Sequence, residues 1–490
     1  MAKLTTQAGG VSIGRAVGTL AGLATVMILS RLLAPADYGS YRQVWLVFFT
    51  LAPILELGVP PSVSFFGPQL TREERKTYLA QNGLTLVVSG ALLALALFSF
   101  AGPIARLFRN PELAVPLRAF AIFPAFTLSY DLVENALVSL GRAGTSGIVT
   151  AGNAVLQAGV TLAAFASGAP LPQVFLYLGL FALLRWILCV ALLLYVYRDL
   201  PIRWDARLLR GQLAFALPMG AATMVGLLTR QADKIIVSSH FSPDHFAVYS
   251  NGAYDIPLIN ILTMSVTAVL VPAIVRAHTE GRIDEVQRLW HGAARRVATL
   301  FFPAFCLLFI AARPFVVFLF SPEYAASADP FRVFLFLLPL RIVFHSGLLR
   351  ALGRTRPIFY TAIGAFVIGV TLALLLVRIE PLGLLGPALG SVVAAYWAAA
   401  YAIRVTCRAI GWSWRDYLPW RTLGAIMAVA LAAALPTLGV GWLVRHAAPF
   451  PQLAAMGATY AAAYLVLGET TGAARTREWR QAIADVIRQR

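Results

Sequence analysis

Apolar runs long enough to cross a lipid bilayer follow one another along almost the whole chain. A helix needs about 20 apolar residues to span the hydrocarbon core, and fourteen runs approach or exceed that length. They cover residues 9–33, 38–66, 78–101, 114–140, 146–168, 171–197, 213–240, 246–275, 291–312, 330–352, 357–377, 382–405, 422–444 and 451–468. The pattern predicts an all-α polytopic membrane protein with 14 transmembrane helices.

Similar segments recur in the two halves of the chain. The segment "SRLLAPADYGSY" (30–41) aligns with "SSHFSPDHFAVY" (238–249). This internal repeat predicts two six-helix lobes, residues 1–205 and 206–410, followed by a C-terminal helix pair and a basic cytoplasmic tail in residues 411–490. An even number of helices per lobe makes the repeat parallel, and a binding site is expected between the lobes.

Composition agrees with a membrane protein. The 490 residues are 59% hydrophobic and only 13% charged, far from the average of soluble domains. The net charge of +18 would suggest a nucleic-acid partner in a soluble protein, but here the arginines lie mainly in short connectors between apolar runs. Most lie on the face that holds both chain ends, so the positive-inside rule places both termini in the cytoplasm, and no nucleic-acid partner is expected.

Metal and disulfide chemistry find no support in the pattern of cysteines. Cys189, Cys306 and Cys407 show neither paired spacing nor metal-ligand spacing. No connector is long enough to hold a soluble catalytic domain, and no nucleophile constellation is present. We therefore expect no cofactor and no enzymatic activity, and we look for function inside the helical bundle.

Several segments resemble a known family. They are "LAPADYGSYRQVW", "ELGVPPSVSFF", "QADKIIVSSHFSPDHFAVYSNGAYDI" and "FSPEYAASADPFRVFLFLLP". They look like the polysaccharide-transporter branch of the multidrug/oligosaccharidyl-lipid/polysaccharide (MOP) exporter superfamily, and the resemblance covers nearly the whole chain. It implies a flippase that moves a polyprenyl-pyrophosphate-linked oligosaccharide from the cytoplasmic to the periplasmic leaflet by alternating access. It also implies that Asp233 matches an acidic residue common in helix 7 of the family.

Three charges interrupt the apolar run 213–240. Arg230, Asp233 and Lys234 stand at i, i+3 and i+4, which places them on one helix face. The equivalent helix of the first lobe carries no charge at the matching positions, so the fold does not require them. An ionisable residue at membrane depth costs about 2.5–3.5 kcal/mol on insertion scales, which favours a functional role.

These charges predict a site for a phosphate head group. Arg230 and Lys234 are expected to bind the pyrophosphate, while Asp233 limits their net charge in the empty site. The alternative is a closed set of salt bridges in which Asp233 and Asp255 neutralise the two cations. Asp233 and Asp255 are also candidates for ion coupling.

A second group of charges falls in the first lobe. Arg15, Glu56, Asp131 and Glu134 all lie in the cytoplasmic half of their predicted helices. Asp131 and Glu134 are one turn apart, and like charges held close raise one pKa. This group predicts a site that couples a proton or sodium gradient to transport, with Arg15 also a candidate substrate ligand. The alternative is that Arg15 and a neighbouring hydroxyl merely satisfy the acids.

Two arginines and a histidine lie near mid-depth. Arg341 is a candidate substrate ligand, with pairing to an acid as the alternative. Arg185 and His345 are expected to have structural roles.

Three other functions remain open. The peptidoglycan lipid-precursor flippase also has fourteen helices, cation-coupled small-molecule exporters belong to the same superfamily, and a membrane-embedded polysaccharide polymerase would act on the same lipids. The expected partners are a lipid-linked oligosaccharide, membrane lipids, and a polysaccharide polymerase with its chain-length machinery. The expected location is the bacterial inner membrane, and the glycan is that of O-antigen, capsule, exopolysaccharide or spore coat.

Overall fold

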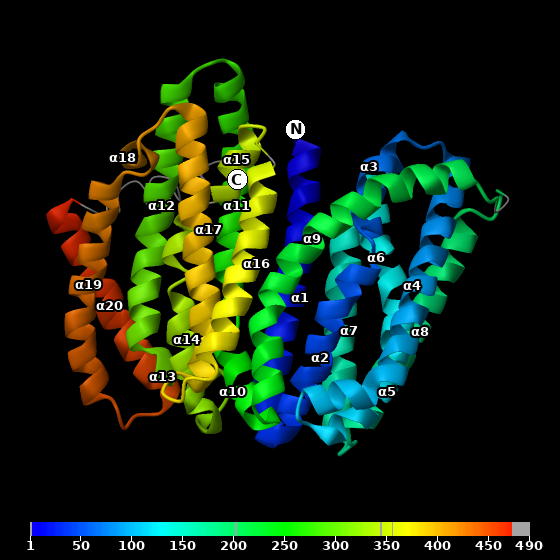
Figure 1. Ribbon diagram of the computed structural model, residues 1–490, viewed down its shortest axis with the longest axis horizontal. Helices are drawn as coiled ribbons and strands as arrows, with labels where there is room; N and C mark the ends of the chain where they lie inside the picture. Colours follow the sequence, from blue (N-terminus) through cyan, green and yellow to red (C-terminus); the bar gives the residue numbers. More distant parts are fainter. Residues whose placement is uncertain (1, 201–202, 344, 355, 473–490) are drawn as a thin grey trace. The chain divides into compact units, whose positions relative to one another are not determined.

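The chain is helical throughout the part that the structure describes. The computed structural model covers residues 2–200, 203–343, 345–354 and 356–472, without the side chains of residues 2–9, 11, 64, 131, 139, 219, 221–223 and 258. No β-strand occurs among these residues (Figure 1). The predicted basic tail after residue 472 lies outside the described residues. The helices form two compact units, Met1–Ala247 and Val248–Arg490, and each is described by itself.

The first unit contains nine α-helices and two short 3₁₀ helices among its described residues, before the helix at its boundary. They are α1 (Ala2–Leu32), α2 (Pro35–Leu55), α3 (Val59–Phe66), η1 (Gly67–Gln69), α4 (Arg72–Leu107), η2 (Pro111–Leu113), α5 (Ala114–Phe120), α6 (Ile122–Ser139), α7 (Ala143–Ala166), α8 (Leu171–Val196) and α9 (Ala206–His240).

The second unit begins within α10 (Pro243–Gly252). Its described helices continue with α11 (Pro257–Thr279), α12 (Ile283–Ile310), α13 (Ala312–Leu319), η3 (Pro322–Ser327), α14 (Ala328–Leu335), η4 (Pro339–Ile342), α15 (His345–Ala351), α16 (Arg356–Leu376), η5 (Gly383–Leu385), α17 (Gly386–Ile410), α18 (Trp414–Tyr417), α19 (Trp420–Leu443) and α20 (Pro449–Thr471).

Membrane-spanning helices make up most of both units. Among the described residues, ten helices are long and apolar enough to cross a membrane, or thirteen spans if each of three bent helix pairs counts as one. The remaining predicted run, 213–240, corresponds to α9, which is not among these spans and which contains the undescribed side chains at 219 and 221–223. The helical membrane class is therefore confirmed, while the count of fourteen spans is not.

Four of the predicted continuous runs are broken helices. Runs 114–140 and 330–352 each contain a bend of 47°, and runs 38–66 and 246–275 are also divided. The run 38–66 is α2 and α3, bent by 45° at a break that contains Leu57 and Gly58 in left-handed conformation. The run 246–275 is α10 and α11, and Pro257 begins the second helix. Proline has no backbone N–H to extend the hydrogen-bond ladder of the helix before it. An acidic residue lies at each of these last two breaks, Glu56 or Asp255, but a hydropathy window of about 20 residues averages over it, so hydropathy alone did not reveal the break.

The order of helices repeats along the chain. α2 begins at Pro35, and α10 begins at Pro243, 208 residues later. The bent pairs that begin at Pro111 and Pro322 bend by 47° each. The internal repeat of the sequence is thus matched by a repeat of bends.

The long helix α9 belongs to the first compact unit, where it contacts α2, α3 and α4. At the break between α2 and α3, a Cβ atom on Gly58 would lie 2.4 Å from the Ala216 carbonyl oxygen and 2.8 Å from the Gly220 nitrogen. The two backbones can approach this closely because neither Gly58 nor Gly220 has a side chain. The lobe boundaries that the repeat predicts, 1–205, 206–410 and 411–490, stay a prediction.

Aromatic side chains fill the interior of each unit. In the first, Trp45 and Phe48 of α2 pack edge-on against Phe120 and Phe123, with ring centroids 5.4–5.7 Å apart. Such edge-to-face pairs stabilise the fold beyond the effect of the area that the rings bury.

Pairs of adjacent helices pack along each other in the second unit. α16 packs along α17, and α19 packs along α20 (Figure 1).

Candidate functional site

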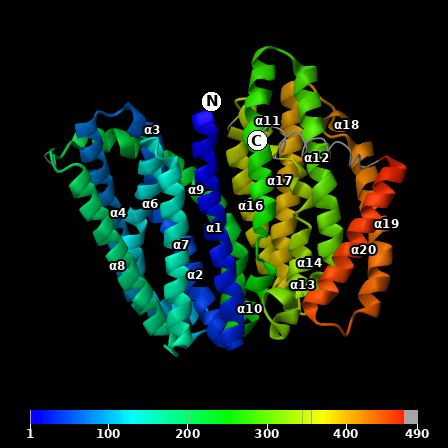
Figure 2. The same cartoon turned by 180° about the vertical axis from the view of Figure 1, so that it is seen from behind.

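Close packing of α1 on α7 positions Arg15, one of the charges predicted in the first lobe (Figure 2). A Cβ atom on Gly14 would lie 2.2 Å from the Gly147 carbonyl oxygen, and one on Gly10 would lie 2.9 Å from Gly144 Cα. Small residues four positions apart let membrane helices approach to backbone contact. This contact places Arg15, the residue after Gly14, beside the neighbouring helix α6.

Arg15 and Glu134 form an ion pair in that position. The Arg15 guanidinium donates to Glu134 Oε1 at 3.0 Å from Nε and 2.6 Å from its terminal nitrogen. The Thr150 hydroxyl donates to the other carboxylate oxygen at 3.3 Å. This geometry is the one that the structural alternative anticipated. The ion-coupling role of Glu134 stays a prediction.

The other two acids predicted in the first lobe, Asp131 and Glu56, also belong to the first unit. Asp131 stands one turn before Glu134 on α6, and its side chain lies outside the described residues. Glu56 is the residue at which α2 ends, immediately before the break at Leu57 and Gly58. Glu56 therefore lies at a break in the backbone, while Glu134 lies within α6.

The three charges of the predicted run 213–240 lie on α9. Asp233 is buried, with 4% of its side chain exposed, and its Oδ1 lies 3.8 Å from Lys234 Nζ. Lys234 also donates to the Arg230 carbonyl oxygen at 3.1 Å. The Arg230 side chain is exposed, and no acidic partner lies within ion-pair distance of it among the described residues. One cation of the three-residue set is thus neutralised and one is available.

Asp255 and Arg341 are brought together in the second unit. Arg341, in η4, donates to Asp255 Oδ1 at 2.9 Å and to Asn260 Oδ1 at 2.7 Å. Asp255 lies in the break between α10 and α11, and η4 lies in the break between α14 and α15. The partner of Asp255 is therefore Arg341, where the sequence had suggested Arg230 or Lys234. Pairing with an acid was the alternative considered for Arg341.

Arg185 is enclosed by α6, α7 and α8. It donates to Asn153 Oδ1 at 2.6 Å and to the Thr127 hydroxyl at 3.0 Å, and it lies 4.0 Å over the Tyr130 ring. Only 8% of the residue is exposed. A buried cation with this many partners ties helices together, which agrees with the structural role expected from the sequence.

A buried polar cluster that the sequence did not predict joins α2 to α9. The Gln43 amide donates to the Ser238 hydroxyl at 2.9 Å and accepts from the Asn110 amide at 2.8 Å. All three side chains are almost fully buried. The signal that could have found them is a polar residue inside an apolar run, yet such residues are too common in membrane helices to be selected without the fold.

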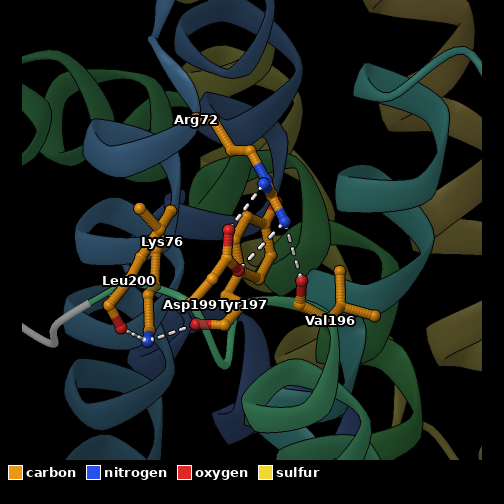
Figure 3. A network of polar contacts seen from close by, with 6 residues as sticks. All are labelled: Arg72, Lys76, Val196, Tyr197, Asp199 and Leu200. Atoms are coloured by element: carbon orange, nitrogen blue, oxygen red, sulfur yellow. Dashed lines mark hydrogen bonds and ion pairs between the residues drawn. The ribbon is translucent and has the colours of Figure 1, made fainter.

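Basic side chains at the start of α4 hold the connector between α8 and α9 (Figure 3). Lys76, 4% exposed, donates to the Tyr197 carbonyl oxygen at 2.6 Å and also to that of Leu200. Arg72 donates to Asp199 at 2.8 and 3.1 Å and to the Val196 carbonyl oxygen at 3.2 Å. The carbonyl groups left free where a helix ends are favourable partners for cations. This connector is the predicted link between the two lobes.

Comparison with known proteins assigns the family and the fold. The family described as polysaccharide biosynthesis protein matches residues 28–329. No curated protein sequence matches the chain. Among solved structures, the lipid II flippase MurJ in an inward closed conformation is similar with a TM-score of 0.73 and 13% identity, covering 96% of this chain and 99% of that one.

Two further structures show the same fold. An inward-facing multidrug resistance MATE family transporter of the MOP superfamily is similar with a TM-score of 0.63 and 16% identity, over 80% of this chain and 94% of that one. A MOP superfamily transporter from Pyrococcus furiosus is similar with a TM-score of 0.56 and 17% identity, over 84% of this chain and 95% of that one. The chain therefore belongs to the polysaccharide biosynthesis protein family, and it is a multi-pass helical membrane protein with the fold of the MOP-superfamily transporters.

Proposed function

We propose that this protein is a flippase that moves a polyprenyl-pyrophosphate-linked oligosaccharide from the cytoplasmic to the periplasmic leaflet of a bacterial inner membrane. The family match carries the proposal. Polysaccharide assembly on a lipid carrier needs a step in which the charged, hydrated head group crosses hydrocarbon. A helical transporter can provide that step, because it offers a polar path through the bilayer.

The charges on α9 support a phosphate-bearing substrate. Arg230 offers a planar guanidinium whose donors match phosphate oxygens, and it is exposed and without an acidic partner among the described residues. Lys234 is paired only loosely with Asp233, at 3.8 Å. A pyrophosphate would bring the negative charge that Arg230 lacks, and it would compete with Asp233 for Lys234. Arg15 and Arg341 are each paired with an acid and could bind substrate only on leaving Glu134 and Asp255.

The first-lobe acids supply the proposed coupling to a proton or sodium gradient. A cation that binds Glu134 would compete with Arg15 for the same carboxylate oxygen. Asp131 stands one turn away on the same helix, and Glu56 at the break between α2 and α3. Release of Arg15 would then free a cation on α1 in one state of the transport cycle. In the same way, a cation that binds Asp233 would compete with Lys234 on α9, and one that binds Asp255 would compete with Arg341 in the second unit.

The test is a leaflet assay in cells depleted of the protein. A membrane-impermeant glycan-digesting enzyme is added to spheroplasts, and polyprenyl-linked glycans are then measured by mass spectrometry. We expect an intact lipid-linked oligosaccharide to accumulate and to be shielded from the enzyme, and its mass identifies the glycan.

Other results would contradict the proposal. Accumulation of a lipid-linked oligosaccharide that the enzyme can digest would place the defect after translocation. Accumulation of the peptidoglycan lipid precursor alone would assign the function of the structurally similar MurJ to this chain. Absence of any accumulated lipid would favour a small-molecule exporter of the same superfamily.

A further inference from the structure

A groove runs between α11 and α12 in the second unit. Its volume is about 580 Å³, which falls in the range of small-molecule sites. The wall formed by α11 is apolar except for Ser265, and it includes Val266, Val269 and Leu270. The wall formed by α12 carries two arginines, Arg288 and Arg296. One side of the groove thus suits hydrocarbon, and the other suits negative charge.

The two arginines lack acidic partners. Both side chains are exposed, and no carboxylate lies within ion-pair distance of either among the described residues. The groove also contains Glu285, but this carboxylate is paired with Arg282. Two cations without an ion-pair partner in the described part of the chain therefore line the groove.

Arg296 lies just inside the apolar part of α12. α12 is one of the helices long and apolar enough to span a membrane, and its first turns are polar. Arg296 is the sixth residue of the predicted run 291–312, so both arginines lie near one end of the span, at the level where lipid head groups lie.

Gly292 and Ala293, which lie between the two arginines in the sequence, also line the groove. A Cβ atom on Gly292 would meet no other atom within 4 Å, so the space beside this glycine is open. Glycine within a helix costs about 1 kcal/mol relative to alanine. The chain thus keeps an unfavourable helix residue at the point where a larger side chain would fill the groove.

We propose that this groove binds the phosphate group of a membrane amphiphile, with Arg288 and Arg296 as ligands of the phosphate and the α11 wall as the contact for its hydrocarbon chain. The arginines are eight residues apart, about 12 Å along the helix, so two long side chains can reach one phosphate or pyrophosphate group. If the amphiphile is the lipid-linked oligosaccharide, the groove is a loading site for the proposed transport, and only that choice of source rests on the proposed function.

Photo-crosslinking to the full-length purified protein in nanodiscs tests the proposal. The probe is a polyprenyl pyrophosphate that carries a diazirine on its first isoprene unit, and labelled peptides are identified by mass spectrometry. We expect label on α11 and α12 peptides. Excess undecaprenyl pyrophosphate should reduce this label at least fivefold, whereas excess undecaprenol should reduce it less than twofold.

Two variants act on the groove in different ways. Gly292→Leu fills the groove and leaves both arginines in place, and we expect it to fold because the added side chain meets open space. Arg288→Gln with Arg296→Gln removes the charges and leaves the groove open. Each should lower the α11–α12 label at least fivefold.

Matched controls are available in the same unit. Gly424 of α19 is an exposed helical glycine whose Cβ would also meet no atom within 4 Å, so Gly424→Leu adds the same side chain elsewhere. Arg350→Gln with Arg354→Gln removes two arginines outside the groove. Both controls should change the label less than twofold.

Competition by phosphatidylglycerol identifies the source of the phosphate. Competition equal to that of undecaprenyl pyrophosphate supports a site for phosphate lipids in general, and much weaker competition supports the transported lipid. Equal competition by undecaprenol, or loss of label in neither groove variant, would overturn the proposal. These outcomes are independent of the leaflet assay, so failure of the groove and failure of the flippase function can be told apart.

Discussion

Arg230 carries the strongest claim to bind substrate at the residue scale. Its neighbour Asp233 is buried and holds Lys234, so Arg230 keeps an uncompensated charge on α9. A hydrogen bond to a charged group contributes about 1.5–3 kcal/mol, which corresponds to roughly 10- to 100-fold in binding.

We predict that Arg230→Gln lowers translocation of the lipid-linked oligosaccharide by at least 10-fold, while Arg230→Lys keeps part of the rate. The measurement is the initial rate of translocation in reconstituted vesicles. Arg207→Gln, which removes an exposed charge from the same helix, is the control and should leave the rate unchanged. Equal rates for Arg230→Gln and the control would remove Arg230 from the substrate site.

Glu134 is predicted to couple transport to an ion gradient. Glu134→Gln keeps the shape of the side chain but can no longer exchange Arg15 for a cation. The variant should transport at a rate that does not respond to an imposed pH or sodium gradient, and Asp131→Asn should act in the same way. The measurement is the transport rate in vesicles with and without each gradient. A gradient dependence equal to that of the unchanged protein would refute this role.

Spacing along one helix shows which side chains share a face, and it does not show which partner lies across from them. Arg230, Asp233 and Lys234 were therefore recognised from the sequence as one group. The pairing of Asp255 with Arg341 joins two helix breaks 86 residues apart, and the sequence gives no signal for it. Arg288 and Arg296 were overlooked because they flank the start of a predicted span, where arginines are usual.

At the scale of elements, glycine determines how closely α1 and α7 pack. Gly14→Ala would place a methyl group 2.2 Å from the Gly147 carbonyl oxygen. We predict a loss of about 1–3 kcal/mol in the free energy of unfolding, since overpacking displaces the backbone. Gly22→Ala on the same helix is the control, because its methyl group meets nothing within 4 Å, and it should be neutral or slightly stabilising.

Unfolding of the purified protein in mixed micelles of increasing denaturing detergent measures both variants. Equal stability of Gly14→Ala and Gly22→Ala would show that α1 and α7 do not make backbone contact.

The connector between α8 and α9 depends on Lys76. Lys76→Met leaves the Tyr197 and Leu200 carbonyl oxygens without their donor, and a lost buried hydrogen bond costs roughly 1–3 kcal/mol. We predict faster trypsin cleavage after Arg198 and Arg203 in the variant, with Lys76→Arg closer to the unchanged protein. Cleavage at the same rate in Lys76→Met would show that Lys76 does not hold the connector.

Apolar length predicted the position of nearly every element, because the thickness of the bilayer fixes the length of a spanning helix. The breaks inside four runs were not predicted, since a hydropathy window of about 20 residues averages over the few polar residues at a break. The break before α11 depends on Pro257, and the break after α2 depends on left-handed Leu57 and Gly58 packed on α9. Tertiary packing decided where these helices bend, while several other prolines lie within helices that continue.

At the scale of the whole molecule, the chain has the fold of the MOP-superfamily transporters, and we propose a substrate that carries phosphate. Family, fold and helical membrane class are shown by the comparisons and the structure. The substrate, the coupling ion and the placement of both termini in the cytoplasm remain proposals. The proposed substrate and the proposed coupling ion share one requirement, which is that the protein alone moves a lipid-linked glycan between leaflets.

Translocation by the purified protein in vesicles tests that requirement most directly. The lipid-linked oligosaccharide is incorporated into proteoliposomes, and the fraction digested by an impermeant glycosidase added outside is followed over time. The account predicts that nearly all of the glycolipid becomes accessible in vesicles that contain the protein, while about half is accessible in protein-free vesicles. Half accessibility in both, with the protein folded and correctly inserted, would contradict the flippase function.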